Sequence, residues 1–142
     1  MNKIKRITIP WVHFVAYRLA AELMLYNEPI PDFSTRFPNV LESCIETPFQ
    51  TYAKKPLYRG LIGKATALFY FIIKNHPFQN GNKRIAVVTL IAFLFENNKR
   101  MNKVTNDELY SFAVYVAKSS SEDKDIVMDK IYKFLSTKTK RI

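Results

Sequence analysis

A nine-residue turn between two apolar runs, residues 76–84 with the sequence HPFQNGNKR, constrains this chain more than any other feature. Pro77 has a fixed φ and keeps the residue before it out of the helical region. We therefore expect a helix over residues 60–75 to end near Asn75 and to present His76 on a turn. Periodicity alone leaves the apolar run 85–95 open to a strand or a helix, but its length favours a second buried helix.

Lys83 and Arg84 fall in or just before the first turn of that second helix, where the helix dipole disfavours cations. The first N–H groups of a helix have no partner within it, so together with two cations they form a phosphate site. A base such as His76 beside an anion site indicates group transfer from a phosphorylated donor to a hydroxyl. The simpler alternative is a capping or turn histidine next to a solvated basic pair.

The turn resembles the signature of the Fic/Doc family, whose Fic branch carries H-P-F-x-[D/E]-G-N-G-R-x-x-R and whose Doc branch carries H-x-F-x-[D/N]-[A/G]-N-K-R. The chain departs from the Fic form at Asn80, Lys83 and Val87. The resemblance extends less specifically from about Glu28 to Leu135. It implies an all-α fold, a compact helical bundle with a short β-hairpin-like flap near the active-site loop. The chain matches the Doc form at every specified position: His76, Phe78, Asn80, Gly81, Asn82, Lys83 and Arg84.

The resemblance implies a role for each motif residue. His76 would be the general base, and Pro77 and Phe78 would anchor the loop. Asn80 stands where the family also uses an acid, so it would be a weak Mg²⁺ ligand acting through water. Arg84 would also stabilise phosphate charge in the transition state. The residues that would bind the nucleotide phosphates are Gly81, Asn82, Lys83 and Arg84.

A second element of the site is expected in an irregular, aromatic hairpin at residues 49–58. The alternative from the residues alone is an ordinary loop packed through its aromatic side chains. The resemblance favours a flap over the active site that pairs with an extended segment of the target. Its target-binding residues would be Phe49, Gln50, Thr51 and Tyr52.

Lys83 bears on which reaction is catalysed. A glycine here, as in the Fic branch, lets the donor phosphates lie close to the backbone, and AMP is transferred. The Doc-like lysine implies transfer of the γ-phosphate of ATP, with Mg²⁺, to a Thr or Ser hydroxyl of a protein such as elongation factor Tu, which would inhibit translation. The alternatives are an AMP transferase and a catalytically weak Fic-fold binding protein, the latter favoured only by Asn80.

Many Fic proteins carry an inhibitory glutamate in a motif [S/T]-x-x-x-E-[G/N]. Glu96 and Asn97 match its end, but Ala92 occupies the position that requires Ser or Thr. The resemblance therefore implies a toxin whose inhibitory glutamate comes from a separate antitoxin chain.

Composition restricts the remaining possibilities. A chain of 142 residues, 48% hydrophobic, is predicted to form one domain over residues 1–142. The single Cys44 excludes an internal disulfide and is expected to be a buried thiol of a cytoplasmic protein, and no apolar run is long enough to span a membrane. The net charge of +10 is concentrated partly at the ends, about 1–7 and 137–142, which we expect to be solvated or disordered. The charge permits a nucleic-acid partner, an acidic protein partner or merely a lysine-rich solubilising surface. Because the cations form no aromatic-interleaved stripe, we favour the solubilising surface for most of them, although an acidic antitoxin or target would still be attracted, and we do not expect nucleic acid.

The remaining predicted elements have recognisable ends. Thr8 followed by Pro10 opens a helix that extends to Tyr26, with His13 and Arg18 on its surface. A proline-rich loop, a short helix over 40–45 and two closing helices complete the chain, the first of them opened by a capping box of Thr105 and Glu108.

Overall fold

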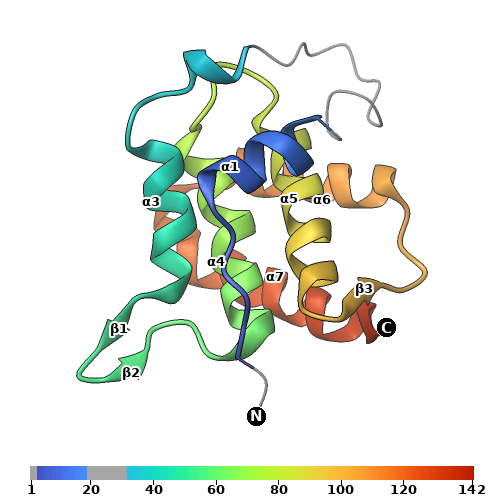
Figure 1. Cartoon of the computed structure of the whole chain (residues 1–142). Coiled ribbons are helices and arrows are strands. Elements are labelled where there is room, and N and C mark those ends of the chain that lie inside the picture. The colour runs from blue at the N-terminus through green and yellow to red at the C-terminus, as the bar shows by residue number, and fades with distance from the viewer. Residues whose placement is uncertain (1–2, 19–31) are drawn as a thin grey trace.

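Two long central helices form the middle of the structure, a computed structural model that describes residues 3–18 and 32–142 (Figure 1). Helix α4 spans Gly60–Asn75, and α5 spans Asn82–Glu96. They pack against each other along their length and bury residues on more than one face, as expected for helices that are apolar nearly all round. Both predictions for this region are confirmed, including the choice of helix for residues 85–95.

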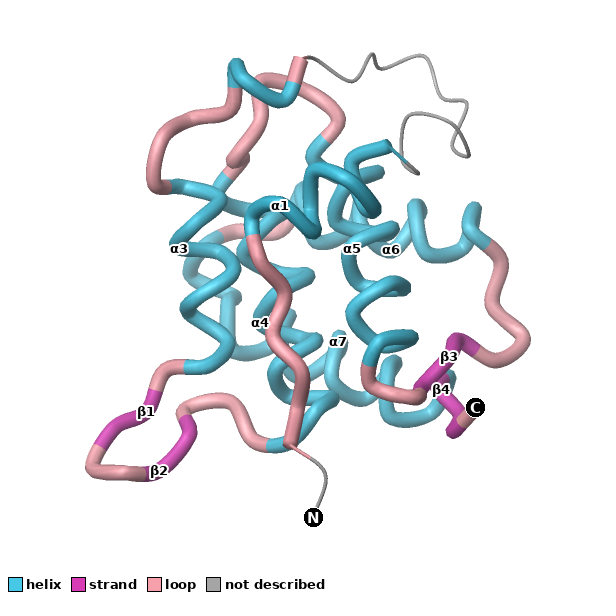
Figure 2. The backbone as a smooth tube through the Cα atoms, in the orientation of Figure 1, coloured by secondary structure: helices cyan, strands magenta, loops and turns pink. Residues whose placement is uncertain are grey.

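Further helices surround this pair (Figure 2). Helices α3, α6 and α7 pack on α4, whereas α6 and the N-terminal π-helical segment η1 pack on α5. The bounds are α1 Ile9–Trp11, η1 Val12–Tyr17, η2 Phe33–Thr35, α3 Val40–Glu46, η3 Thr47–Phe49, α6 Asn106–Lys118, η4 Ser121–Asp123 and α7 Lys124–Lys138. In the described residues, no helix has both the length and the apolar character needed to cross a membrane.

The predicted helix starts agree with the structure. The Thr8 hydroxyl accepts a hydrogen bond of 3.2 Å from the backbone N–H of Trp11. The Thr105 hydroxyl accepts one of 3.1 Å from the N–H of Glu108, which completes the capping box of α6. The first helix becomes π-helical after Trp11, which its cap did not indicate, and the part of it predicted beyond residue 18 lies outside the described residues.

Over residues 3–18 and 32–142, four short strands form two antiparallel pairs. Strands β1 (Thr51–Tyr52) and β2 (Lys55–Pro56) make the predicted hairpin. Strand β3 (Lys99–Met101) pairs with β4 (Thr139–Arg141), a pairing that the sequence did not predict.

The two basic ends are solvated, one of the two outcomes expected for them, because in the described residues their lysines and arginines are exposed or, at Lys138, half-buried. The described backbone of both ends is nevertheless held in place. Residues 139–141 are held by backbone hydrogen bonds to β3. At the other end, the backbone N–H of Lys5 donates to Asn97 Oδ1 at 2.7 Å, and Ile7 is buried. Backbone hydrogen bonds and one buried apolar side chain hold the described parts of these ends, and neither contact can be predicted from the charge pattern.

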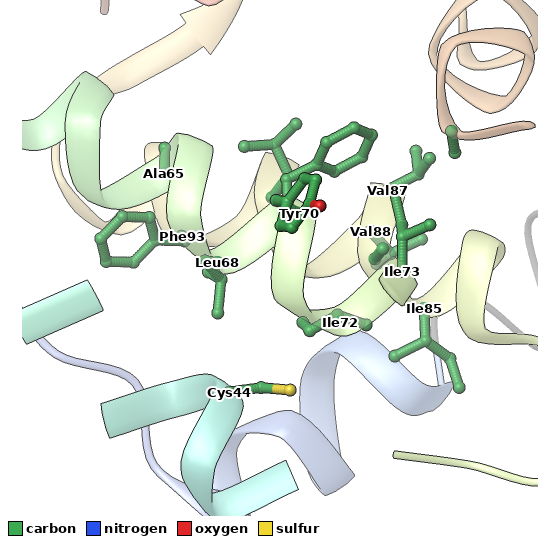
Figure 3. Close-up of a cluster of buried hydrophobic side chains, with 14 of the residues drawn as sticks. Cys44, Ala65, Leu68, Tyr70, Ile72, Ile73, Ile85, Val87, Val88 and Phe93 are labelled. Atoms are coloured by element: carbon green, nitrogen blue, oxygen red, sulfur yellow. The ribbon is translucent and has the colours of Figure 1, made fainter. Parts of the chain in front are cut away.

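The core is centred on α4 and α5 and includes side chains of α3, α6 and α7, and Figure 3 shows part of it. Cys44 of α3 faces α4 there, is fully buried, and its Sγ lies 3.4 Å from the carbonyl oxygen of Phe71. Burial raises the pKa of this thiol to about 12. The prediction of a buried thiol at Cys44 is confirmed.

Candidate active site

The motif loop connects the C-terminal end of α4 to the N-terminal end of α5. His76 adopts a left-handed conformation, φ 50° and ψ 63°, directly after the last residue of α4, and its side chain is exposed. Gly81 is also left-handed, with φ 76°, a conformation that costs a glycine little because it has no Cβ. These two residues end one helix and begin the next, so the loop presents His76 on a rigid base.

Phe78 and Asn82 fix the loop from beneath. The Phe78 ring is 1% exposed, and its centroid lies 5.7 Å from that of Phe33. The backbone N–H of Phe78 donates to Asn82 Oδ1 at 3.0 Å, while Asn82 Nδ2 donates to the Phe78 carbonyl at 2.8 Å. Pro77 is buried beside them. The two residues predicted to anchor the loop, Pro77 and Phe78, therefore lie in its buried part.

The two bonds to Phe78 also determine which way the Asn82 amide points. Its oxygen must face the Phe78 N–H, so its NH₂ group faces His76, whose Nδ1 lies 3.5 Å from Asn82 Nδ2. The side chain of Asn82 is thus committed to the loop, and only 6% of the residue is exposed. An anion at this helix end would meet the backbone of Asn82 before its amide.

Both predicted cations lie in the first turn of α5. Arg84 is 4% exposed and Lys83 is half-buried, and the first turn contains no acidic residue. A positive helix end and two cations make the electrostatic potential here strongly positive. The arrangement fits a phosphate group.

The fit to a metal ion is poorer. Asn80 is exposed at the tip of the loop and offers one neutral amide oxygen. In the described residues, no group of three His, Cys, Asp or Glu side chains could hold a metal ion. Any Mg²⁺ bound at this loop would depend on phosphate oxygens and water for most of its ligands.

The hairpin predicted as a flap forms, but its position differs from the one expected. It precedes α4, whereas the motif loop follows it, and a helix of 16 residues is about 24 Å long. Figure 1 shows β1 and β2 at the opposite end of α4 from the loop. The reason is α3, which runs beside α4 and carries the chain away from the loop before the hairpin begins.

The four predicted flap residues have other surroundings. Phe49 packs edge-on against Phe93 with a centroid distance of 6.2 Å. The carbonyl of Gln50 accepts a hydrogen bond from the N–H of Leu57 at 3.0 Å, and Thr51 and Tyr52 are exposed. The structure does not bring them to His76.

A different segment, residues 32–37, lies against the motif loop. The backbone N–H of Phe37 donates to the carbonyl of Pro77 at 2.9 Å. The Phe33 ring contacts Phe78 and stacks on His13 at 4.3 Å, so His13 is half-buried, which differs from the surface position expected for it. The prolines around this segment led us to expect only a loop. The sequence feature that could have indicated this contact is the pair Phe33 and Phe37, two phenylalanines four residues apart in a polar loop.

Arg36 and Glu42 brace this segment. The Arg36 guanidinium lies 4.6 Å from the centroid of Phe33 and 3.6 Å from a carboxylate oxygen of Glu42. The other carboxylate oxygen of Glu42 accepts from the Asn39 N–H at 2.6 Å, which caps α3. The segment is therefore tied both to α3 and to the motif loop.

Comparison with known proteins identifies the family of the chain. A family model described as the Fic/DOC family matches residues 15–94, more than half of the chain, including α4, the motif loop and most of α5. Searches of curated proteins and of solved structures gave no match. The chain belongs to the Fic/DOC family.

Proposed function

We propose that this chain is a Doc-like phosphotransferase that moves the γ-phosphate of ATP to a Thr or Ser hydroxyl of a protein. Members of the Fic/DOC family are generally transferases that act on protein hydroxyl groups. The observation that carries the finer proposal is Lys83, half-buried in the first turn of α5.

His76 has the position that a general base requires, exposed on a loop whose backbone is fixed by Asn82. It takes the proton of the target hydroxyl as that oxygen bonds to the γ-phosphorus. The bond from this phosphorus to the β–γ bridging oxygen breaks, and ADP leaves. The N-terminal end of α5 and Arg84 stabilise the charge on the transferred group. Asn80 would help to hold Mg²⁺ together with the nucleotide phosphates and water, and the ion would neutralise further charge there.

Lys83 favours phosphoryl over AMP transfer for a steric and an electrostatic reason. A lysine stem occupies space that a glycine would leave to the donor phosphates next to the helix end. Its ammonium also adds a point charge that attracts the terminal, most highly charged part of ATP. Lys83 also disfavours the alternative activity, AMP transfer, because that reaction needs the donor phosphates to lie close to the backbone at the start of α5.

We propose elongation factor Tu as the target and a cytoplasmic location, because the Doc-like motif is associated with that substrate. The inhibitory partner is a separate antitoxin chain whose glutamate pairs with Arg84. A catalytically weak binding protein is the second candidate, and the observation favouring it is Asn80, which places an amide where a carboxylate would bind Mg²⁺ more strongly.

The test is to incubate the chain with Mg²⁺, purified elongation factor Tu and ATP labelled on either the α- or the γ-phosphate. We expect label in the protein from the γ position only. Label from the α position would establish AMP transfer instead. Label from neither position would favour the binding protein.

Two matched pairs of variants assign the roles. His76→Ala should reduce transfer at least a thousandfold, whereas Gln79→Ala, at an exposed position of the same loop, should leave it within twofold. Lys83→Gly should lower γ-transfer more than tenfold. Its control is Lys103→Gly, which removes the same charge at an exposed residue with φ 58°, where glycine is well tolerated. Equal rates for Lys83→Gly and the unmodified chain would remove the argument from Lys83.

A further inference from the structure

A second strongly positive site lies at the other end of α5 from the motif loop. A groove of about 740 Å³ opens between the N-terminal segment, the end of α5 and the β3–β4 pair. Three separate parts of the chain contribute its cations. The lining residues are Lys3, Ile4, Lys5, Leu61, Glu96, Asn97, Asn98, Lys99, Arg141 and Ile142.

The walls of this groove are held together by polar contacts. The Asn97 side chain bonds both backbone groups of Lys5, accepting from its N–H at 2.7 Å and donating to its carbonyl at 3.2 Å. The N–H of Ile142 donates to the carbonyl of Asn98 at 3.0 Å and so extends the β3–β4 pairing. These contacts fix both walls relative to the end of α5, so the groove is part of the fold.

The register of β3 and β4 places like charges opposite each other. Lys99 pairs with Arg141, and Arg100 pairs with Lys140. Directly opposed like charges destabilise an antiparallel pair. Because side chains alternate between faces, Lys99 and Arg141 point to the groove while Arg100 and Lys140 occupy the other face. Because Lys99 and Arg141 break this rule inside a groove, we expect a bound anion to offset the repulsion between them.

The groove itself does not contain enough negative charge to do so. Its side chains comprise four cations and one carboxylate, Glu96, which leaves +3. The C-terminal end of α5 contributes the equivalent of roughly half a negative charge. The remaining positive charge is exposed or half-buried, so it is accessible to an anionic partner and attracts one.

We infer that this groove binds an extended acidic peptide segment of a partner protein. Extended backbone flanks the groove, and Ile4 and Leu61 supply apolar floor between the cations, which suits a strand with alternating acidic and apolar side chains. Among the described residues, no aromatic side chain lines the groove, so they offer none of the stacking surface used for single-stranded nucleic acid. Carboxylates are therefore the anions that fit.

The experiment measures fluorescence anisotropy of a labelled six-residue peptide that alternates Asp and Val, added to the intact chain. An otherwise identical peptide with Asn for Asp and a six-nucleotide oligothymidylate serve as competing probes. The variants are two double substitutions in the same strands: Lys99→Gln with Arg141→Gln in the groove, and Arg100→Gln with Lys140→Gln on the opposite face. Both pairs change the net charge equally.

We expect the groove pair to weaken binding of the Asp peptide at least tenfold, and the opposite-face pair to change it less than twofold. Lys3→Gln with Lys5→Gln, on the other wall, should also weaken it and provides an independent test should the groove pair fail to fold. Three results would overturn the proposal. They are an equal loss of Asp-peptide affinity in the two double variants of β3 and β4, an affinity for the Asn peptide equal to that for the Asp peptide, and no binding of the Asp peptide at 1 mM. Tighter binding of the oligonucleotide through the same residues would assign the groove to nucleic acid instead. None of these results depends on transfer activity at His76.

Discussion

The Asn82 amide joins the backbone of Phe78 to the ring of His76, and each contact uses a different part of the amide. A carboxamide is the one common side chain of this size that donates and accepts in the same plane. The sequence motif specified the residue, but only the structure shows that its amide bonds the loop itself.

Replacing Asn82 by alanine should therefore destabilise the chain. Two hydrogen bonds to the buried backbone of Phe78 would be lost, leaving a donor and an acceptor unsatisfied, at about 1–3 kcal/mol each. We expect the free energy of unfolding, measured in urea, to fall by at least about 2 kcal/mol. Asn80→Ala, on the exposed tip of the same loop, is the control and should cost less than about 0.5 kcal/mol. Similar losses in both variants would show that the amide bonds do not hold the loop.

Cys44 predicts a dependence of stability on pH. Burial raises the pKa of its thiol from 9.0 to about 12, so the folded state binds the proton more tightly than the unfolded state. The associated stability is complete below pH 9 and is lost as the pH rises toward 12, by up to about 1.4 kcal/mol per pH unit. The measurement is urea unfolding at pH 8.0 and 10.5 for the unmodified chain and for Cys44→Ala. The unmodified chain should lose more stability between these two values, because alanine has no proton to lose, and parallel losses would contradict the assignment.

At the scale of elements, the segment 32–37 and the β1–β2 hairpin are the two candidates for the element that would contact the target protein of the proposed reaction. Only the first contacts the motif loop, through the Phe37–Pro77 hydrogen bond and the Phe33–Phe78 ring contact. The hairpin, which carries the exposed Tyr52, lies at the far end of α4 from the motif loop.

Phe33→Ala should lower the rate of transfer to the protein target at least tenfold, because the loop loses the ring that supports Phe78. Tyr52→Ala should leave the rate within twofold. The two variants remove aromatic rings from the two competing elements, so a rate assay at fixed ATP distinguishes them. A large loss in Tyr52→Ala alone would restore the hairpin as the flap.

The elements that the sequence predicted well are those that have a local cause. Pro77 ends α4, Thr105 and Glu108 cap α6, and the apolar run after Arg84 forms α5. What could not be predicted depends on contacts between distant residues. The β3–β4 pairing joins segments about forty residues apart in sequence, and neither segment has an alternating apolar pattern.

The same division holds for the candidate site, in which local features could be predicted and contacts between distant residues could not. The motif identified the loop and its charged residues because these are contiguous in sequence. The position of the hairpin required knowing that α3 and α4 run side by side in opposite directions, which fixes the end at which each connection emerges. A segment that approaches the loop from elsewhere, as Phe33 and Phe37 do, leaves only a weak local signal.

At the scale of the whole molecule, α5 separates the motif loop from the basic groove by its full length. A helix of 15 residues is about 22 Å long, more than two Debye lengths at physiological ionic strength. The positive charge of one site is therefore largely screened from the other. Their two anionic ligands should bind independently.

Removing residues 139–142 tests this separation. The deletion removes β4, which includes Arg141, and leaves β3 without its partner strand. Helices α4 and α5 and the motif loop keep their contacts with one another. We expect the melting temperature to fall by several degrees, because the Lys99–Met101 strand loses its ladder. The acidic peptide should bind at least tenfold more weakly, while the rate of γ-phosphate transfer, measured well below the new melting temperature, should remain within twofold of the full chain. A parallel loss of transfer would mean that the groove and the motif loop are coupled through α5, and the two sites would then have to be treated as one.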